Sequence, residues 1–394
     1  MARRILIVGG GYAGLVCANR LARKTREADA EIVLVEARPW FVERVRLHQD
    51  AAGQSVATRT SIASRIRDTR VKLRVGRVEA LDLVHRRALV DGVGEAFDDL
   101  VLATGSGASR PAVPGLASTL SCDTAEHAAL LRARLDALSG GAIVIVGGGL
   151  TGIELAAEIA ERRRDLTVTL VDAGELGADL SPSARAHLRR VLTSLRVSIR
   201  ERDRVAAFEV DAVVLASGDA LPSDASVWTG GFEAAPLGRL AGLTVDAIGR
   251  AHVDERLRSA SHGFVRVIGD AARVMTRDSR GALAPVRMAC ATATPQGAFA
   301  ADDIAREIEG RTRETFSFGY PGRSISLGRR DGIVQLTDRH DAPGAFIGGR
   351  PAAWLKELVC RFAAGANAME RRGVGYAWLR APAARADTQK VLGT

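Results

Sequence analysis

Cysteine is scarce in this 394-residue chain, and no two cysteines stand at a spacing that suggests a joint function. The four residues are far apart in the sequence: Cys17, Cys122, Cys290 and Cys360. Because no C-x-x-C pair exists, a zinc knuckle and a redox disulfide of that type are excluded. We expect unpaired thiols in a reducing cytoplasm and no bound metal.

Lysine is almost absent as well. Only four of the 55 basic residues are lysines, namely Lys24, Lys72, Lys356 and Lys390. The formal charge of +9 therefore comes from arginines, which are scattered among Asp and Glu, and no basic block is interleaved with aromatic residues. This pattern is not that of a nucleic-acid-binding protein, but it suits anionic small ligands.

Long apolar runs are also missing. No stretch approaches the ~18 uncharged apolar residues of a membrane-spanning helix. The first strand is expected to begin by residue 3, which leaves no room for a signal peptide. We therefore expect a cytoplasmic protein.

What the chain does contain is a segment that occurs twice. Residues 5–24, "ILIVGGGYAGLVCANRLARK", return at 143–163 as "IVIVGGGLTGIELAAEIAERR". Each copy has a short apolar strand, a glycine turn and a helical pattern, and a further buried strand follows each copy. This order predicts two βαβ units with parallel sheets. With 47% apolar residues, the chain can fill two or three domains.

The first glycine turn has the features of a dinucleotide site. Gly9, Gly11 and Gly14 match G-x-G-x-x-G directly after a strand and at the start of a helix. Such a turn brings a diphosphate to the free amides of a helix N-terminus. Glu36 ends the next strand, where its carboxylate can accept hydrogen bonds from ribose hydroxyls.

The second turn repeats each of these parts. Gly147, Gly149 and Gly152 form the glycine pattern, and Asp172 ends the following strand. Two adenine nucleotides are therefore expected to be bound at once. Because the Asp172 carboxylate would repel a 2′-phosphate, the second site is expected to favour NADH over NADPH.

With these motifs the sequence resembles the two-dinucleotide flavoproteins of the pyridine nucleotide-disulfide oxidoreductase superfamily. Within that superfamily it is similar to the branch of type II NADH dehydrogenases and apoptosis-inducing factor. Three more stretches agree with the resemblance. "VLATGS" (101–106) and "VVLASG" (213–218) look like the turns at which the chain crosses between nucleotide domains. "FVRVIGDAA" (264–272) looks like the second flavin motif, in which Asp270 would bind the ribityl chain.

The resemblance implies an α/β fold with two Rossmann-like, three-layer nucleotide-binding domains, the second inserted in the first, and a small C-terminal α+β module. The FAD-binding domain would comprise residues 1–112 and 245–312, the NAD(P)H-binding domain residues 113–244, and the module residues 313–394. FAD would occupy the first site and NADH or NADPH the second.

The residues expected at the FAD site are Gly9, Gly11, Tyr12, Ala13, Gly14, Glu36, Ala37, Arg38, Arg44, Val78, Ala103, Thr104, Gly105, Gly269, Asp270, Met288 and Ala289. Those expected at the nicotinamide nucleotide site are Gly147, Gly149, Thr151, Gly152, Asp172, Ser217 and Gly218.

Three residues are candidates for a chemical role. Glu154 follows the second glycine turn and would lie beside the nicotinamide, or else simply satisfy the helix N-terminus. His48 lies in a stretch expected near the flavin ring, where it would transfer a proton or serve only as a hydrogen-bonding residue. Cys290 would stand next to the flavin as a reactive thiol or as a small packed residue.

Two departures from the family concern the electron acceptor. Cys17 has no partner cysteine at the spacing of the disulfide reductases, so reduction of a disulfide substrate is disfavoured. Quinone-reducing relatives carry A-Q-x-A-x-Q, whereas residues 290–295 read "CATATP" and Gln296 stands one place late. The expected function is therefore hydride transfer from NAD(P)H through FAD to a small acceptor, with a quinone as one option. One alternative is an FAD-dependent dehydrogenase or oxidase of an organic substrate with a vestigial NAD(P)H site. A second is a nucleotide-sensing or binding protein that carries FAD without turnover.

The C-terminal module contains an amphipathic segment. One helical stripe carries Trp354, Leu355, Leu358, Val359 and Phe362. It is expected to pack on the flavin domain or on the second subunit of a homodimer, and at most to make peripheral membrane contact. The tail from residue 381 onward is too polar to insert into a membrane.

Overall fold

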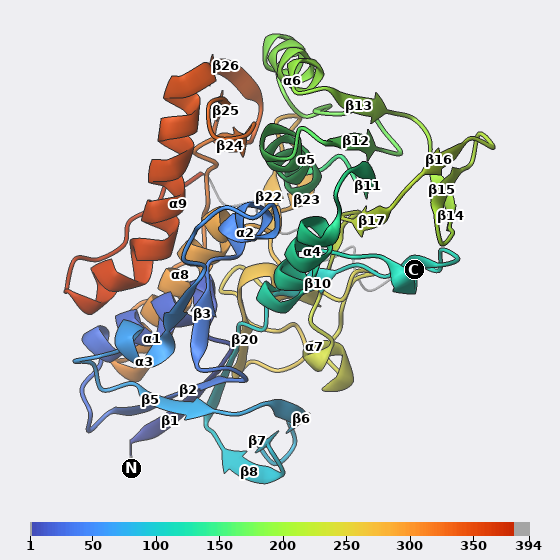
Figure 1. Ribbon diagram of the computed structural model, residues 1–394. Coiled ribbons are helices and arrows are strands. Elements are labelled where there is room, and N and C mark those ends of the chain that lie inside the picture. The colour runs from blue at the N-terminus through green and yellow to red at the C-terminus, as the bar shows by residue number, and fades with distance from the viewer. Residues whose placement is uncertain (1, 382–394) are drawn as a thin grey trace.

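The computed structural model describes residues 2–381, and its first layer is a five-stranded parallel sheet (Figure 1). In spatial order the strands are β20 (Val265–Val267), β9 (Asp99–Leu102), β1 (Arg3–Val8), β2 (Ala30–Glu36) and β5 (Lys72–Val75). β1 pairs with β2 on one side and with β9 on the other. The strand order therefore reverses at the carboxyl end of β1, where parallel α/β sheets bind their ligands.

A second parallel sheet repeats this arrangement. Its strands in spatial order are β13 (Val197–Arg200), β12 (Leu166–Val171), β11 (Gly141–Val146) and β17 (Ala225–Trp228). β11 takes the place that β1 has in the first sheet, between β12 and β17. The chain leaves the first sheet after β9, builds the second, and returns to the first with β20, so the second unit is inserted in the first. The α/β class of the fold is thereby confirmed.

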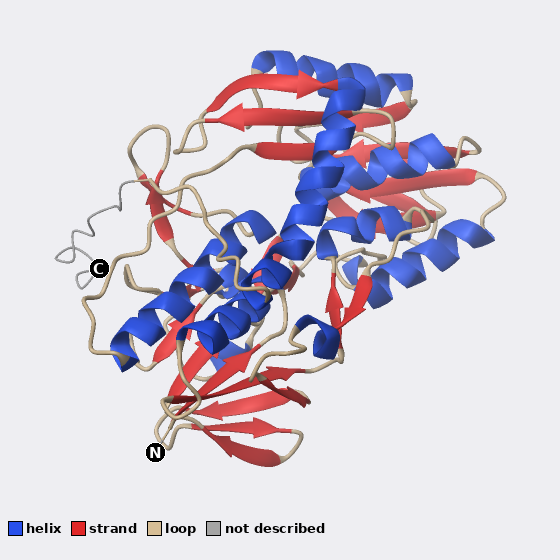
Figure 2. Ribbon diagram, turned by 90° about the vertical axis from the view of Figure 1, so that its left-hand side faces the viewer, coloured by secondary structure: helices blue, strands red, loops and turns tan. Residues whose placement is uncertain are grey.

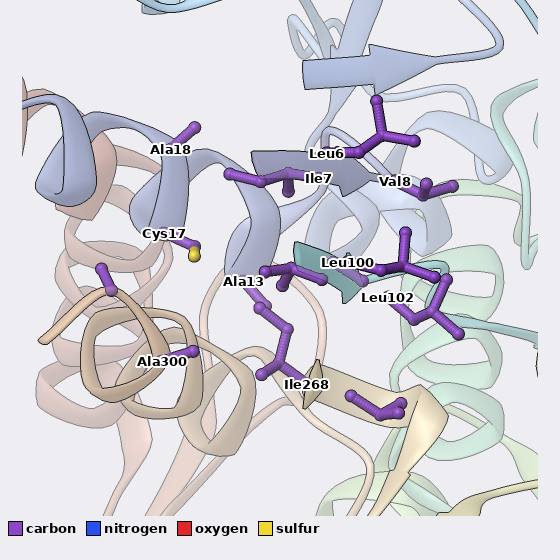
Figure 3. Close-up of a cluster of buried hydrophobic side chains, with 14 of the residues drawn as sticks. Leu6, Ile7, Val8, Ala13, Cys17, Ala18, Leu100, Leu102, Ile268 and Ala300 are labelled. Atoms are coloured by element: carbon purple, nitrogen blue, oxygen red, sulfur yellow. The ribbon is translucent and has the colours of Figure 1, made fainter. Parts of the chain in front are cut away.

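Apolar helix faces close the core of the first unit (Figure 3). The helices α1 (Tyr12–Lys24) and α8 (Cys290–Ile308) pack against each other beside this sheet. Ala13, Cys17 and Ala300 from these helices belong to the same core as Leu6 and Leu102 of the strands. Small residues at the crossing let the two helix backbones approach closely.

The core of the second unit draws on distant parts of the chain. Its helices are α4 (Ala125–Ala137), α5 (Leu150–Arg162) and α6 (Pro182–Ser194). α4 and α6 begin at side-chain caps, Thr124 and Ser181, each of which accepts a backbone N–H of the first turn. The short helix α2 (Leu47–Ala51) belongs to the chain between β2 and β5 of the first unit, but it packs into this second core against α4 and α5.

The C-terminal module consists of an antiparallel sheet and a long helix. The strands are β24 (Arg323–Ser326), β25 (Gly332–Thr337) and β26 (Pro343–Gly348), and the helix is α9 (Gly349–Arg371). The strands lie between α9 and the helices α5 and α6, while α9 continues down to α1 (Figures 1 and 2). Residues 382–394, including most of the polar tail, lie outside the described part.

The apolar stripe of α9 does not pack on the flavin domain as expected. Trp354 is 63% exposed and Phe362 53%, and Leu358 and Val359 are exposed as well. The packed face instead carries Ala352, Cys360, Ala364 and other small or polar residues. Packing on the flavin domain is therefore wrong, because periodicity shows which residues share a face, but not which face is covered. The other expectation, packing on the second subunit of a homodimer, stays a prediction. No helix within residues 2–381 is both long and apolar enough to cross a membrane.

The prediction that residues 213–218 form the second crossing turn is also wrong. β15 (Ala212–Leu215) belongs to a separate antiparallel sheet with β14 (Val205–Phe208) and β16 (Ala220–Pro222). Ser217 and Gly218 lie on an exposed turn of that sheet. The strand beside β11 is β17, so Thr229 and Gly230 take the place that Ala103 and Thr104 have in the first unit.

The remaining elements are short. The strands are β3 (Trp40–Val42), β4 (Arg59–Ser61), β6 (Val78–Asp82), β7 (Arg87–Val90), β8 (Val93–Ala96), β10 (Ser106–Ala108), β18 (Phe232–Ala234), β19 (Ala251–His252), β21 (Ala272–Arg273), β22 (Met275–Arg277) and β23 (Leu283–Pro285). The helices are α3 (Ile62–Arg65), α7 (Leu237–Leu240) and the 3-10 turns Arg44–Arg46, Leu116–Ser118 and Gly269–Ala271. Leu237 and Leu243, within the range predicted for the NAD(P)H-binding domain, pack in the core of the first unit. The domain boundaries given above stay predictions.

Candidate functional site

The first glycine loop is tight everywhere except at its middle position. A Cβ atom on Gly9 would strike the carbonyl oxygen of Ala103, and one on Gly14 would strike the carbonyl oxygen of Gly9. A Cβ atom on Gly11 would meet nothing within 4 Å. Gly11 is the N-cap of α1 and offers no side-chain cap, so the first amides of the helix are free for an anion.

The second loop has the same construction. A Cβ atom on Gly147 would strike the backbone of Thr229 and Gly230, and one on Gly152 the carbonyl oxygen of Gly147. Gly149 again has open space and is the uncapped N-cap of α5. Both loops therefore fit a diphosphate at a helix N-terminus, as FAD and a nicotinamide nucleotide require.

A carboxylate at the end of the second strand closes each loop. The backbone N–H of Gly10 donates to Glu36 Oε2 at 2.6 Å. In the second unit the N–H of Gly148 donates to Asp172 Oδ2 at 2.5 Å, and that of Gly174 donates to Oδ1 at 2.7 Å. Each carboxylate is fixed at the mouth of its loop, where the expected ribose would lie.

The second flavin motif lies beside the first loop. Ser106 Oγ donates to Asp270 Oδ2 at 2.7 Å, so this carboxylate is held by the first residue of β10. A Cβ atom on Gly269 would stand 3.4 Å from that of Ala13. The late Gln296 is buried and accepts the Gly269 N–H at 2.8 Å, so it supports this turn.

The start of α8 presents free backbone donors to the same region. The N-cap is Ala289, without a side-chain cap, and Met288 and Ala289 are half-buried. Arg44 lies near the crossing turn, with Nη1 3.8 Å from the position of a Cβ atom on Gly105. The remaining predicted residues lie along the two loops and their rims: Tyr12 and Thr151 in the first turns of α1 and α5, Thr104 after β9, Ala37 and Arg38 exposed after β2, and Val78 at the start of β6.

Three parts of the chain meet at the Glu154 carboxylate. Glu154 extends from α5, and its Oε1 atom lies 2.8 Å from Lys356 Nζ of α9. Its Oε2 atom lies 3.6 Å from Nδ1 of His48 on α2. The backbone N–H of Ser326, at the end of β24, donates to Oε1 at 3.0 Å. All three side chains are largely shielded from solvent.

This arrangement determines the protonation of the group at neutral pH. Burial alone would raise the pKa of Glu154, but the Lys356 ammonium, His48 and the hydrogen bond from Ser326 together outweigh it and hold the pKa below the usual value. Burial works against the Lys356 ammonium too, yet Glu154 raises the pKa of that lysine. Burial lowers the pKa of His48 to about 4. The centre thus holds an ion pair beside a neutral imidazole.

Two buried polar atoms, one at this centre and one at the start of α1, have no hydrogen-bond partner within residues 2–381. They are Nε2 of His48 and the hydroxyl of Tyr12, whose ring packs edge-on against Phe41 at 5.0 Å between centroids. A buried polar group without a partner is costly unless a ligand supplies one. Each atom is therefore available for a hydrogen bond with a bound ligand.

Cys290 is a weak candidate for a reactive thiol. Burial raises its pKa to about 11, although Lys356 acts in the opposite direction. The thiol is then neutral at physiological pH and a poor nucleophile.

Sequence reasoning missed Lys356 and Ser326. Ser326 lies 172 residues after Glu154 in the chain, Lys356 lies later still, and both are next to Glu154 in space. The one available signal for Lys356 is that an arginine-rich chain retains a lysine there. An ammonium is compact and carried on a flexible stem, and it fits this buried position better than a guanidinium.

Comparison with known proteins gives consistent results. The sequence profile of the pyridine nucleotide-disulphide oxidoreductase family matches residues 3–297. An NADH dehydrogenase-like protein of Mycobacterium tuberculosis is 30% identical over 329 residues, which cover 77% of this chain and 80% of that protein. Demethylphylloquinone reductase NdbB of Synechocystis is 28% identical, covering 88% and 90% of the two chains. The structure of NDH2 from Plasmodium falciparum in complex with NADH aligns with a TM-score of 0.76 at 13% identity, covering 96% of this chain and 100% of that one.

Proposed function

This chain belongs to the pyridine nucleotide-disulphide oxidoreductase family and is an FAD-dependent NAD(P)H oxidoreductase, and on that premise we propose that it oxidises NADH and reduces a quinone-type acceptor. FAD, when bound, supplies the two-electron carrier between the two substrates. The observation that carries the proposal is the meeting of α5, α2 and α9 at Glu154, next to the second glycine loop.

The preference for NADH rests on the charges around Asp172. Its carboxylate is fixed by two backbone amides and would face the 2′ position of the ribose. The neighbouring Arg202 is paired with Glu175, so its charge is already neutralised. A 2′-phosphate would meet the Asp172 anion, whereas a 2′-hydroxyl could donate a hydrogen bond to it.

An intact second loop argues against a vestigial nucleotide site. Gly149 keeps the open space and the uncapped helix start that Gly11 has in the first loop. Folding alone does not require a glycine at position 149, because a Cβ atom there would meet nothing within 4 Å.

The quinone-type acceptor is supported by chemistry more than by the family motif. Gln296 supports Gly269 and is not free to bind a quinone. The Glu154–Lys356 pair instead places an ammonium and a carboxylate beside the expected nicotinamide. Such a pair can stabilise a developing oxyanion on the acceptor and hold the proton that its reduction requires.

Anaerobic rapid mixing of the purified holoenzyme tests the proposal. NADH should bleach the flavin absorbance at about 450 nm within milliseconds to seconds, and NADPH should do so with a lower kcat/KM. A second mixing with the water-soluble quinone menadione should restore the colour. The proposal fails if NADH does not bleach the protein, and the acceptor class is wrong if menadione does not restore the absorbance while oxygen does.

A further inference from the structure

A row of three carboxylates leads away from the site along α5. Glu154, Glu158 and Glu161 are four and three residues apart, so they lie on one face of the helix. All three accept hydrogen bonds from one segment, residues 326–329. Arg329 N donates to Glu161 Oε2 at 2.6 Å, and Arg329 Nη1 donates to Glu158 Oε1 at 3.2 Å.

Ser326 links the first two carboxylates of this row. Its backbone N–H donates to Glu154 at 3.0 Å, and its hydroxyl donates to Glu158 Oε1 at 3.3 Å. The same hydroxyl also donates to the carbonyl oxygen of Gly328 at 2.9 Å. It reaches Glu154 when the side chain turns about χ1, which the distance of about 3 Å between the N and Oγ atoms of one serine allows. A hydroxyl both donates and accepts hydrogen bonds, so it can pass a proton from one carboxylate to the other.

The two carboxylates have opposite protonation tendencies. Burial raises the pKa of Glu158 above its usual value, although Arg329 and Gln54 act against this effect. The pKa of Glu154 is lowered, because Lys356, His48 and the Ser326 N–H together outweigh its burial. A pair whose environments separate the two pKa values in this way divides into a proton donor and a proton acceptor.

The outer end of the row reaches a cavity of about 650 Å³ between α5, α6 and the turn from β24 to β25. Gln54, Glu161 and Arg329 line it. Glu158 itself is fully buried, and its two outer partners are Gln54, at 3.1 Å, and Arg329. The Arg329 side chain is 40% exposed, and Arg329 and Gln54 separate Glu158 from the cavity, so water reaches Glu158 when these side chains move.

We propose that Glu158 and the Ser326 hydroxyl carry a proton from this cavity to Glu154. This inference rests on the proposed function and deepens it. NADH supplies a hydride, which is two electrons and one proton, and a quinone takes up two electrons and two protons. The second proton comes from water, so that NADH, one solvent proton and the quinone give NAD⁺ and the hydroquinone.

The transfer balances at each residue. Water in the cavity protonates Glu158, and Glu158 passes a proton to the Ser326 oxygen while the serine hydroxyl, turned from Gly328 toward Glu154, releases its own proton to Glu154. Glu154 then gives the proton to the reduced acceptor and returns to its ionised state beside Lys356. Charged and titratable groups that face this route are Arg329 and Glu161 at the outer end, and His48 and Lys356 at the inner end.

Two variants of the holoenzyme test the route by kinetics. Glu158→Gln and Ser326→Ala should leave the bleaching by NADH within about twofold of wild type, because that half-reaction does not need the solvent proton. Reoxidation by menadione should slow at least about tenfold, with a larger solvent deuterium isotope effect and an altered pH profile. Glu158→Asp should restore part of the rate.

Glu161→Gln is the matched control. It makes the same change one turn further along the same helix, at a half-exposed residue that water can replace, and should retain the wild-type rate. Unchanged reoxidation, isotope effect and pH profile in both Glu158→Gln and Ser326→Ala would overturn the inference. If Glu158→Gln fails to fold, Ser326→Ala decides.

An infrared pH titration of the oxidised holoenzyme, without substrates, provides a readout that does not depend on turnover. A protonated-carboxyl band should persist above the usual pKa range of glutamate in the wild type and in Glu161→Gln, and it should vanish in Glu158→Gln. The same band in Glu158→Gln would assign the proton elsewhere and overturn the inference. Absence of bleaching by NADH in the wild type would overturn the proposed function itself, whereas normal bleaching with unaffected variants would overturn only the route.

Discussion

The helices α1 and α5 begin in the same way and then diverge. Both follow an apolar strand and a glycine loop with open space at the middle glycine. One turn later the positions of Glu154 and Glu158 in α5 correspond to Val16 and Arg20 in α1. The glycine loop determines where a dinucleotide fits, and the next two helical turns determine what else the unit does.

In α1 these turns hold the fold together. Arg20 donates two hydrogen bonds to Asp302 of α8 and one to Glu370 of α9, all between 2.7 and 2.8 Å. In α5 the same turns face the C-terminal module with carboxylates, one of which meets Lys356. The charged residue in these turns of α1 therefore joins helices of the fold, whereas the carboxylates in these turns of α5 lie at the candidate site.

The largest expected effect comes from filling the open space of one loop at a time. Gly11 and Gly149 have negative φ angles of −79° and −67°, so alanine fits each backbone without strain. The added methyl group would occupy the path of the diphosphate. Gly11→Ala should yield protein largely without FAD, and Gly149→Ala should remain yellow but require ~100-fold more NADH for bleaching. Flavin absorbance per protein and the bleaching titration measure both.

Gly14→Ala is the contrasting control for that experiment. Its methyl group would strike the carbonyl oxygen of Gly9, so this variant should lose stability rather than only cofactor. If Gly11→Ala and Gly149→Ala lost the same function, the two loops would not serve different nucleotides.

The next effect in size concerns the ion pair that α5 has and α1 lacks. Lys356→Met leaves the buried Glu154 carboxylate without its ammonium and should lower the free energy of unfolding by about 3–5 kcal/mol. Adding Glu154→Gln should recover most of this loss, because neither charge then remains buried. Urea unfolding of the two single variants and the double variant gives the coupling energy. Additive losses would show that the two side chains do not act as a pair.

The pair also has a defined pH window. The folded protein lowers the pKa of Glu154, with Lys356 acting against the effect of burial. The contribution of this carboxylate to the free energy of unfolding is therefore present above its unfolded pKa and lost as the pH falls through the folded pKa. Glu154 raises the pKa of Lys356. The contribution of this ammonium to the free energy of unfolding is therefore present below the ordinary lysine pKa of 10.5 and lost as the pH rises through the folded pKa. The double variant should lack both losses.

The fold was predictable where the signal is local. Apolar strands, glycine turns and strand-end acids stand within about 35 residues of each other, so both βαβ units and Glu154 could be identified from the sequence. Lys356 and Ser326 could not, because they reach Glu154 only through the packing of a module that follows much later in the chain. "VVLASG" resembles "VLATGS" in letters, but β17 is the strand that pairs with β11. The pairing of strands in the sheet, and not the similarity of two short sequences, determines which turn lies next to a glycine loop.

A smaller effect is expected from His48, which faces Glu154 of α5. Burial lowers its pKa to about 4 from 6.5. The folded protein then binds fewer protons than the unfolded chain between these values, so stability present above pH 6.5 is lost as the pH falls toward 4. The loss should be about 3 kcal/mol. Urea unfolding across this range should give a shallower decline for His48→Gln, while His85→Gln, at an exposed histidine, should decline as the wild type does.

The smallest expected effect separates the two strand-end acids. Glu36 accepts the N–H of Gly10 in the first loop, and Asp172 accepts the N–H of Gly148 in the second. Asp172→Asn removes the charge opposite a 2′-phosphate but keeps an acceptor oxygen, so the preference for NADH over NADPH in kcat/KM should fall about tenfold. Glu36→Gln should leave this ratio unchanged and weaken only the retention of FAD. Equal ratios in all three proteins would mean that the discrimination lies elsewhere, and a fall in Glu36→Gln alone would reverse the assignment of the two loops.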